Sequence, residues 1–227
     1  MSENSDSEER INIMTLGNTE VGKTSYITRY TENNFQEIYL ATIGVDFKVK
    51  NITIKEKVYK LFFYDTTGQE KYKSISFNII KNAQGIIIMY DITNKSSFDS
   101  VTQWITSVQE LKGKKIPMIL IGNKIDKEER RVIETENGEA LAAKFHLDFF
   151  ETSNKTGINI QESALSLINK IIERRESGND SFSMGTKSSK LKSSQHSKKK
   201  NAVKYNFFFH KFYLFLYRLF FYNHNYI

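Results

Sequence analysis

The segment GNTEVGKT at residues 17–24 matches the pattern G-x-x-x-x-G-K-[ST], whose residue types suit the binding of phosphate groups. Gly17 and Gly22 permit a tight backbone whose N–H groups can surround phosphate oxygens at the positive end of a helix. The ammonium group of Lys23 can neutralise β- and γ-phosphates, and the hydroxyl group of Thr24 can bind Mg²⁺. This loop alone leaves kinase, ATPase and GTPase activities open.

The flanking sequence predicts the elements that would position this loop. Residues 11–16 form an apolar run typical of a buried strand, and residues 23–33 have helical spacing. We therefore expect a strand, a glycine-containing turn and a helix in succession, which is the context that the phosphate-binding pattern requires.

Predicted strands and helices alternate through the rest of the first 176 residues. The strands are predicted at 45–54, 58–64, 85–90 and 116–121, and the helices at 97–111, 136–145 and 158–175. Two of the strands are almost continuously apolar, as strands buried on both faces are. We expect a single α/β domain with a six-stranded, mostly parallel sheet, about five helices on both faces, and phosphate binding at the carboxyl ends of the strands.

Four further segments follow the phosphate-binding pattern in order along the chain. They are TIGVDF at 42–47, DTTGQE at 65–70, NKID at 123–126 and ETSNK at 151–155. With these five ordered motifs, the chain resembles the Ras superfamily of small GTPases. TIGVDF and the run GIIIMYDIT at 85–93 resemble the Rab family in particular. The resemblance covers about residues 10–175 and implies a P-loop GTPase fold that binds GTP and GDP with Mg²⁺ and switches partners in vesicle trafficking.

The resemblance implies a guanine site at the last two motifs. Asp126 would accept hydrogen bonds from N1–H and the exocyclic amine, donors that adenine does not present in that arrangement, so GTP is favoured over ATP. Asn123 would hold the loop, and the stem of Lys124 would cover the ring. Ser153 and Lys155 would support Asp126 and the base from the opposite side. The nucleotide-binding residues implied by the resemblance are Gly17, Thr19, Glu20, Val21, Gly22, Lys23, Thr24, Ser25, Phe35, Tyr39, Thr42, Gly68, Asn123, Lys124, Asp126, Ser153, Asn154 and Lys155.

The resemblance also implies how the metal and the attacking water are held. The metal ligands would be Thr24, Thr42 and Asp65, and the catalytic residues would be Gln69, Lys23 and Gly68. Gln69 would orient the water, and the N–H group of Gly68 would meet the γ-phosphate. Residues 17–24 contain no Arg, and no candidate arginine finger is evident in the chain. We therefore predict slow hydrolysis that depends on a GTPase-activating protein (GAP).

Several positions depart from the Rab pattern. Rab effector surfaces commonly use a Phe, Trp and Tyr triad, and the matching residues are Phe47, Tyr64 and Ile79. Thr67 and Asn154 each replace a usual Ala, and Glu20 places a carboxylate near bound phosphate. A nucleotide-loaded interaction module with little turnover is therefore an alternative. A P-loop metabolic kinase is a third, against which Asn123 and Asp126 argue.

The net charge of +7 is concentrated at one end of the chain. Residues 178–227 contain nine Lys and Arg and one acidic residue, so residues 1–177 are nearly neutral. The basic charge therefore indicates a tail beside an anionic membrane surface, and no nucleic-acid partner is expected. The predicted organisation is a flexible N-terminus at 1–10, a Rab-like GTPase domain at 11–176, a disordered Ser/Lys-rich linker at 177–204 and an aromatic tail at 205–227.

The chain contains no Cys, whereas Rab chains normally end in one or two prenylated cysteines. Three interpretations of the aromatic tail are open: a hydrophobic anchor, a segment packed on the domain, or a gene-model artefact that displaces a Cys-bearing end. A membrane-spanning helix is disfavoured because the apolar run 207–222 is short and contains charged residues. The artefact is the favoured interpretation, since AT-rich codons can encode most of this tail.

Composition also sets the expected compartment and partners. The lack of Cys excludes a disulfide framework and thiolate metal sites, and the polar N-terminus contains no signal peptide. We expect a cytoplasmic monomer, on the cytoplasmic face of endomembranes if the true C-terminus is lipidated. The expected partners are a GAP, an exchange factor and effectors that bind the switch regions 36–47 and 65–80, and a membrane surface that binds the basic tail.

Overall fold

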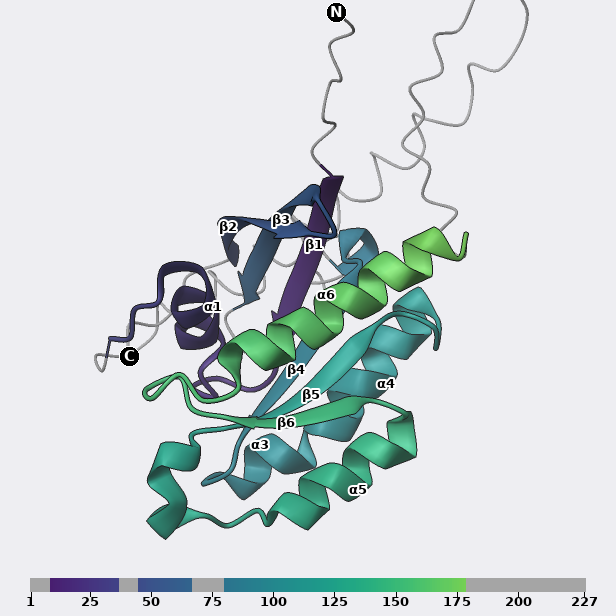
Figure 1. Ribbon diagram of the computed structural model, residues 1–227. Helices are drawn as coiled ribbons and strands as arrows, with labels where there is room; N and C mark the ends of the chain where they lie inside the picture. The colour runs from purple at the N-terminus through teal and green to yellow at the C-terminus, as the bar shows by residue number, and fades with distance from the viewer. Residues whose placement is uncertain (1–8, 37–44, 67–79, 179–227) are drawn as a thin grey trace, which may run out of the picture. The chain divides into compact units, whose positions relative to one another are not determined.

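The computed structural model describes residues 9–36, 45–66 and 80–178 (Figure 1). Several predictions lie outside these residues and stay predictions. They concern Tyr39, Thr42, Thr67, Gly68, Gln69 and Ile79, the linker after Gly178 and the aromatic tail. No helix in the described ranges is long and apolar enough to cross a membrane.

Six strands in the described part form one sheet in the order β2-β3-β1-β4-β5-β6. They are β1 (Glu9–Leu16), β2 (Val45–Ile54), β3 (Lys57–Thr66), β4 (Gly85–Asp91), β5 (Met118–Asn123) and β6 (Asp148–Thr152). All neighbouring pairs are parallel except β2 and β3. The predicted six-stranded, mostly parallel sheet is confirmed. The carboxyl ends of β1, β3, β4, β5 and β6 therefore lie along one edge.

A two-residue turn joins the antiparallel strands β2 and β3. Both turn residues, Lys55 and Glu56, have positive φ, at 50° and 65°, and Ile54 pairs with Lys57. A turn with φ positive at both positions matches the right-handed twist of the strands that it joins. The strands predicted at 45–54 and 58–64 therefore form a tight β-hairpin.

Five α-helices and one 3₁₀-helix, η1, lie in the described ranges. They are α1 (Lys23–Glu32), α3 (Lys95–Asp99), α4 (Val101–Lys112), η1 (Ile125–Arg130), α5 (Thr135–Phe145) and α6 (Ile160–Glu176). The single helix predicted over 97–111 is two helices that meet at Ser100. The Ser100 hydroxyl group donates to the carbonyl oxygen of Ser96 at 2.9 Å, and such a bond competes with the main-chain N–H bonds of a continuous helix.

Two apolar clusters cover the two faces of the sheet. On one face, α1 and α6 pack on residues such as Ile87 and Met89 of β4. On the other face, α4 and α5 pack on residues such as Ile86 and Ile88 of the same strand. Because successive side chains of a strand point to opposite faces, a strand between two helical layers needs an apolar residue at nearly every position. This explains why every residue of β4 and β5 is buried.

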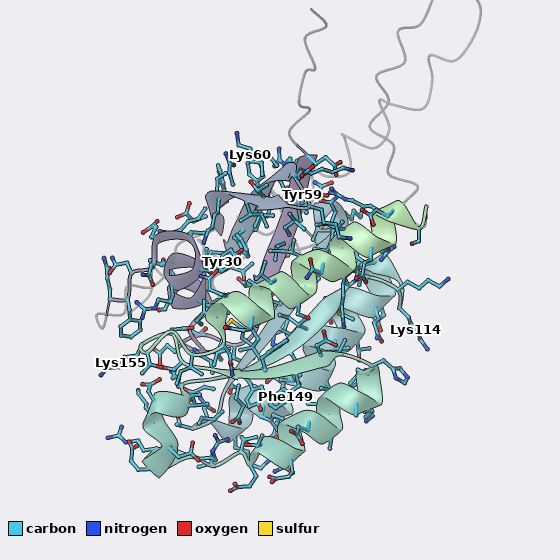
Figure 2. All side chains as sticks on the ribbon, viewed as in Figure 1. Tyr30, Tyr59, Lys60, Lys114, Phe149 and Lys155 are labelled. Carbon is cyan, nitrogen blue, oxygen red and sulfur yellow. The ribbon has the colours of Figure 1, made fainter. Side chains whose placement is uncertain are left out.

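The edge strand β6 was not predicted as a strand. It is five residues long, and only its last residue is fully buried. Phe149 of this strand lies against α5 (Figure 2), where a side chain at Gly138 would meet the ring of Phe149 at 2.3 Å. The strand is therefore held by pairing with β5 and by this contact, and neither is visible as a pattern in its own sequence.

Candidate nucleotide-binding site

The phosphate loop connects β1 to α1 in a backbone conformation that requires glycine at two positions. Gly17 and Gly22 have φ of 142° and 102°, a region that side chains disfavour. A Cβ atom at Gly17 would lie 2.2 Å from the carbonyl oxygen of Met89, and one at Gly22 would lie 2.3 Å from Nδ2 of Asn123. These close approaches account for both glycines of the sequence pattern.

Lys23 begins α1 and directs its ammonium group back into the phosphate loop. Its Nζ atom donates to the carbonyl oxygens of Gly17 at 2.9 Å and of Asn18 at 3.0 Å. The side chain is buried, so the loop encloses its charge. Glu20, by contrast, is exposed and has a φ of 65°. Its carboxylate is thus in contact with solvent, although the left-handed conformation is unfavourable for a residue with a side chain.

The hydroxyl group of Thr24 and the carboxylate of Asp65 meet beside the phosphate loop. Thr24 Oγ1 donates to Asp65 Oδ2 at 2.6 Å. Asp65 lies near the end of β3 and is buried, whereas Thr24 is exposed in the first turn of α1. Hydroxyl and carboxylate oxygens are ligands that Mg²⁺ accepts. The structure therefore brings together two of the three predicted metal ligands, and the third, Thr42, lies outside the described residues.

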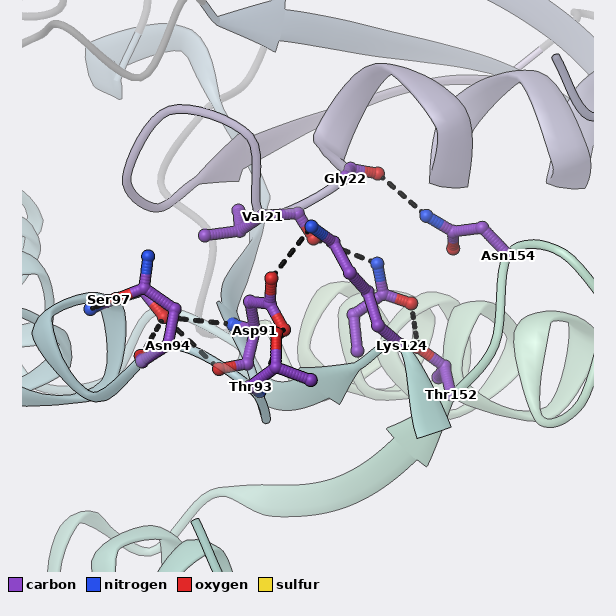
Figure 3. A network of polar contacts seen from close by, with 10 residues as sticks. Val21, Gly22, Asp91, Thr93, Asn94, Ser97, Lys124, Thr152 and Asn154 are labelled. Carbon is purple, nitrogen blue, oxygen red and sulfur yellow. Dashed lines mark hydrogen bonds and ion pairs between the residues drawn. The ribbon is translucent and has the colours of Figure 1, made fainter. Parts of the chain in front are cut away.

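Asn123 joins the NKID loop to the phosphate loop. It is the last residue of β5, it is 1% exposed, and its Nδ2 atom donates to the carbonyl oxygen of Val21 at 2.8 Å. Its Oδ1 atom accepts a hydrogen bond from the hydroxyl group of Thr152 at 3.1 Å (Figure 3). The ends of β5 and β6 and the phosphate loop are thus fixed to one another through a single buried amide.

Asp126 and Ser153 form the second link between the two base-binding motifs. The hydroxyl group of Ser153 donates to Asp126 Oδ1 at 2.6 Å and accepts the N–H group of Thr156 at 3.1 Å. Ser153 is fully buried, so it fixes the carboxylate at the start of η1. Lys155 lies on the same loop at the exposed margin (Figure 2).

Lys124 is held by a carboxylate that the sequence analysis did not identify as functional. Its Nζ atom lies 2.7 Å from Asp91 Oδ2, and Asp91 Oδ1 accepts bonds from the N–H and hydroxyl groups of Thr93 (Figure 3). Asp91 ends β4, next to the strand that carries Asn123. Its position at the end of a buried strand could have identified it from the sequence, because the carboxyl ends of parallel strands share one edge of the sheet.

Three further contacts hold the phosphate loop from outside. Asn154 Nδ2 donates to the carbonyl oxygen of Gly22 at 2.9 Å. Asn18 donates to the hydroxyl group of Ser100 at 3.1 Å and accepts the indole N–H group of Trp104 at 3.1 Å. The contacts of Ser100 and Trp104 with Asn18 were not predicted from the sequence. The 3.6-residue period of α4 shows which face of the helix is buried, but not what a half-buried Trp contacts.

Three further predicted residues lie in the described part of the chain. Thr19 and Ser25 are half-buried in the phosphate loop and the first turn of α1, and Phe35 is half-buried after α1. None of the contacts described above involves Phe35, so its role in nucleotide binding stays a prediction.

The outer face of the β2–β3 hairpin is aromatic. Phe47 is 55% exposed, and its ring centroid lies 6.2 Å from those of both Phe62 and Tyr64. The guanidinium group of Arg10 stacks 3.8 Å from the centroid of Phe62 and donates to the hydroxyl group of Tyr64 at 2.8 Å. Two of the three positions of the predicted effector triad therefore lie next to each other on the surface.

Arg131 connects η1 to β6 behind the base-binding motifs. It donates two hydrogen bonds to each of two carboxylates, those of Glu128 and Glu151. The bonds with Glu151, and then those with Glu128, raise the pKa of the Arg131 guanidinium group. Because Glu151 precedes Thr152 and Ser153, this network supports the strand end from which the last motif begins.

The phosphate loop and the base-binding loops lie at the carboxyl edge of one parallel sheet, an arrangement that defines a P-loop nucleotide-binding protein. The chain matches the Ras family over residues 12–173. It is 40% identical to Ras-related protein Rab-3B of Homo sapiens over 184 residues, which cover 81% of this chain and 82% of the relative. It is 41% identical to Ras-related protein Rab-3C of Bos taurus over 162 residues, 71% of each chain.

The chain therefore belongs to the Ras superfamily of small GTPases and, within it, to the Rab family. It is a GTP-binding protein of the class that acts in vesicle trafficking.

Proposed function

We propose that this chain binds GTP and GDP together with Mg²⁺ at the carboxyl edge of the sheet, hydrolyses GTP slowly, and thereby switches its affinity for partner proteins. The observation that carries the proposal is the link from Asn123 to Val21, because it joins the NKID motif directly to the phosphate loop. A nucleotide could then bind with its base on the NKID loop and its phosphates on the phosphate loop.

Asp126 selects guanine in this proposal. A fixed carboxylate can accept from both N1–H and the exocyclic amine of guanine, and Ser153 holds it in place. Adenine would leave the carboxylate without these donors, which is costly in a desolvated site. The stem of Lys124, directed by Asp91, covers one face of the ring.

The oxygen atoms of Thr24 and Asp65 fit a magnesium site, with Thr42 as a further ligand. A bound Mg²⁺ supplies positive charge next to the phosphate oxygens. Lys23 supplies the second positive charge from within the loop, where its burial strengthens its attraction for phosphate. Its Nζ atom donates to main-chain carbonyl oxygens of the same loop, and this orientation supports a role in binding the phosphates.

Hydrolysis in this proposal depends on positioning and electrostatics. Gln69 orients the attacking water, and the N–H group of Gly68 meets the γ-phosphate. We propose that a GAP accelerates this step, and that effectors and an exchange factor bind segments 36–47 and 65–80. The exposed ring of Phe47 lies in the first of these segments. The basic tail would contact the anionic cytoplasmic face of an endomembrane.

Nucleotide binding and single-turnover hydrolysis test the proposal. We expect Mg²⁺-dependent GTP hydrolysis that a GAP stimulates and that Gln69→Leu abolishes or strongly reduces. Intact binding with no turnover, even in the presence of GAPs, would instead establish an interaction module.

Base selection is tested by Asp126→Asn. The change removes two charge-assisted hydrogen bonds, so GTP affinity should fall by at least about 100-fold. Affinity for XTP should rise, because the amide can donate to the carbonyl group that xanthine carries at this position. A wild-type preference for ATP over GTP would refute the assignment.

A further inference from the structure

The side chain of Asn154 makes a connection that the usual Ala of the family cannot make. Asn154 is 4% exposed, and its Nδ2 atom donates to the carbonyl oxygen of Gly22 at 2.9 Å (Figure 3). The same carbonyl group accepts the N–H group of Tyr26 at 2.9 Å, which is the first bond of α1. Asn154 therefore connects the ETSNK loop to the point at which the phosphate loop becomes a helix.

The absence of a side chain at Gly22 leaves space for two amides. A Cβ atom there would lie 2.3 Å from Nδ2 of Asn123 and 2.7 Å from Nδ2 of Asn154. The first amide donates to the carbonyl oxygen of Val21 and the second to that of the next residue. Two asparagines from neighbouring base-binding motifs thus hold consecutive carbonyl groups of the phosphate loop.

The hydrogen bond from Asn154 to Gly22 contributes little net stability to the fold. Only the amide nitrogen of Asn154 can donate to the Gly22 carbonyl group, so Oδ1 must face elsewhere. That oxygen is buried, and it has no hydrogen-bond partner in the part of the chain that the structure describes. A buried acceptor without a partner costs about as much free energy as one hydrogen bond contributes, or more. Local costs of this kind are typical of sites that serve a ligand.

We propose that Asn154 is a positioning residue that couples the guanine loop to the phosphate loop and slows the release of GDP. The inference rests on the proposed guanine-nucleotide site. Because Asn154 holds the Gly22 carbonyl group, the phosphate loop is already partly ordered before a nucleotide binds. Less of the binding free energy is then needed to order the loop. Contacts to the base then favour the phosphate-binding conformation as well.

The test compares the wild-type protein with Asn154→Ala, which restores the usual family residue and so preserves the fold. Displacement of a fluorescent GDP analogue by excess GDP gives the release rate. We expect release to be about fivefold faster, which corresponds to about 1 kcal/mol, the contribution of one hydrogen bond. The association rate and the thermal stability should be unchanged or slightly raised. Asn154→Ser, whose hydroxyl group is too short to reach Gly22, should behave in the same way.

A second readout separates coupling from general loosening. GMP lacks the β-phosphate that the phosphate loop binds, so the loss of the connection should weaken GMP binding less than GDP binding. The ratio of the Kd for GMP to the Kd for GDP should therefore fall by about the same fivefold factor. An unchanged ratio would refute the coupling.

Asn159 offers a matched control on the loop that follows the same strand. Its Nδ2 atom donates to the carbonyl oxygen of Glu151 at 2.7 Å, and its φ of 56° suits glycine. Asn159→Gly should lower thermal stability and leave GDP release unchanged. Equal acceleration in Asn159→Gly and Asn154→Ala, or a wild-type release rate in Asn154→Ala, would overturn the inference. A wild-type protein that binds no guanine nucleotide would instead overturn the proposed function.

Discussion

Replacing Asp91 by Asn tests whether a carboxylate outside the sequence motifs sets the position of Lys124. The Nζ atom of Lys124 lies 2.7 Å from Asp91 Oδ2, with side-chain exposures of 24% and 9%. In Asp91→Asn, the amide oxygen can still accept the bonds from Thr93, but an NH₂ group faces the ammonium group. The fold is therefore retained, while the stem that is proposed to cover the base loses its anchor.

The magnitude follows from the freedom that Lys124 regains. Ordering a long side chain on binding costs about 0.5–1.5 kcal/mol, so GDP affinity should fall by roughly two- to twelve-fold. The main chain at Lys124 should change little, because the residue has a φ of 75° that its own loop maintains. We expect the loss to appear as faster GDP release with an unchanged association rate, measured by displacement of a fluorescent GDP analogue.

The control for this prediction is Asp99→Asn. Lys95 Nζ also lies 2.7 Å from Asp99, but these side chains are 73% and 56% exposed and distant in sequence from the base-binding motifs. An exposed pair contributes little to stability, so the control should release GDP at the wild-type rate. If Asp91→Asn also releases GDP at that rate while its thermal stability is unchanged, then Asp91 does not position Lys124, and the argument is wrong.

The buried tyrosines and the single Trp give the remaining predictions. The hydroxyl group of Tyr90 is buried and lacks a hydrogen-bond partner among the described residues, so Tyr90→Phe should stabilise the protein by about 1 kcal/mol and raise Tm by about 2–4 °C in a thermal melt. Tyr26→Phe should destabilise it, because Tyr26 shares a 2.8 Å bond with Ser163; Tm values that move in the same direction for both variants would contradict this reasoning. Burial raises the pKa of Tyr26, of Tyr90, and of Tyr30, the last to about 12. Their contribution to stability is complete below the unfolded pKa of about 10 and is lost as pH rises toward the folded values, by about 1.4 kcal/mol per pH unit for each residue; denaturant titrations from pH 9 to 12 measure this loss, and a flat profile would refute it. Trp104, the only Trp, donates to Asn18 of the phosphate loop, so removal of the nucleotide should change its fluorescence, and Asn18→Ala should remove that response.

The sequence was sufficient to predict the fold because its patterns are local. Consecutive residues make up each helical period and each apolar run of a strand that is buried on both faces, as β4 and β5 show. The edge strand β6 and the break at Ser100 were missed for the opposite reason. Pairing with β5 holds β6, and one hydroxyl–carbonyl bond accompanies the break, so neither depends on a repeating pattern.

In the candidate site too, local patterns were predicted from the sequence and long-range contacts were not. The motif at 17–24 predicted two glycines in a tight loop, and their φ values of 142° and 102° bear out that backbone. No motif predicted that Asp91 would pair with Lys124, that Trp104 would bond to Asn18, or that Asn154 would reach Gly22.

The sequence by itself determined the family, the parallel α/β sheet and the residue types that a guanine nucleotide requires. The tertiary structure alone decided which of these residues hold one another. Those contacts join residues as far apart as Gly22 and Asn154, and they form because parallel strands bring their carboxyl ends to one edge of the sheet. Side chains at neighbouring strand ends then lie within hydrogen-bond distance, whatever their separation along the chain.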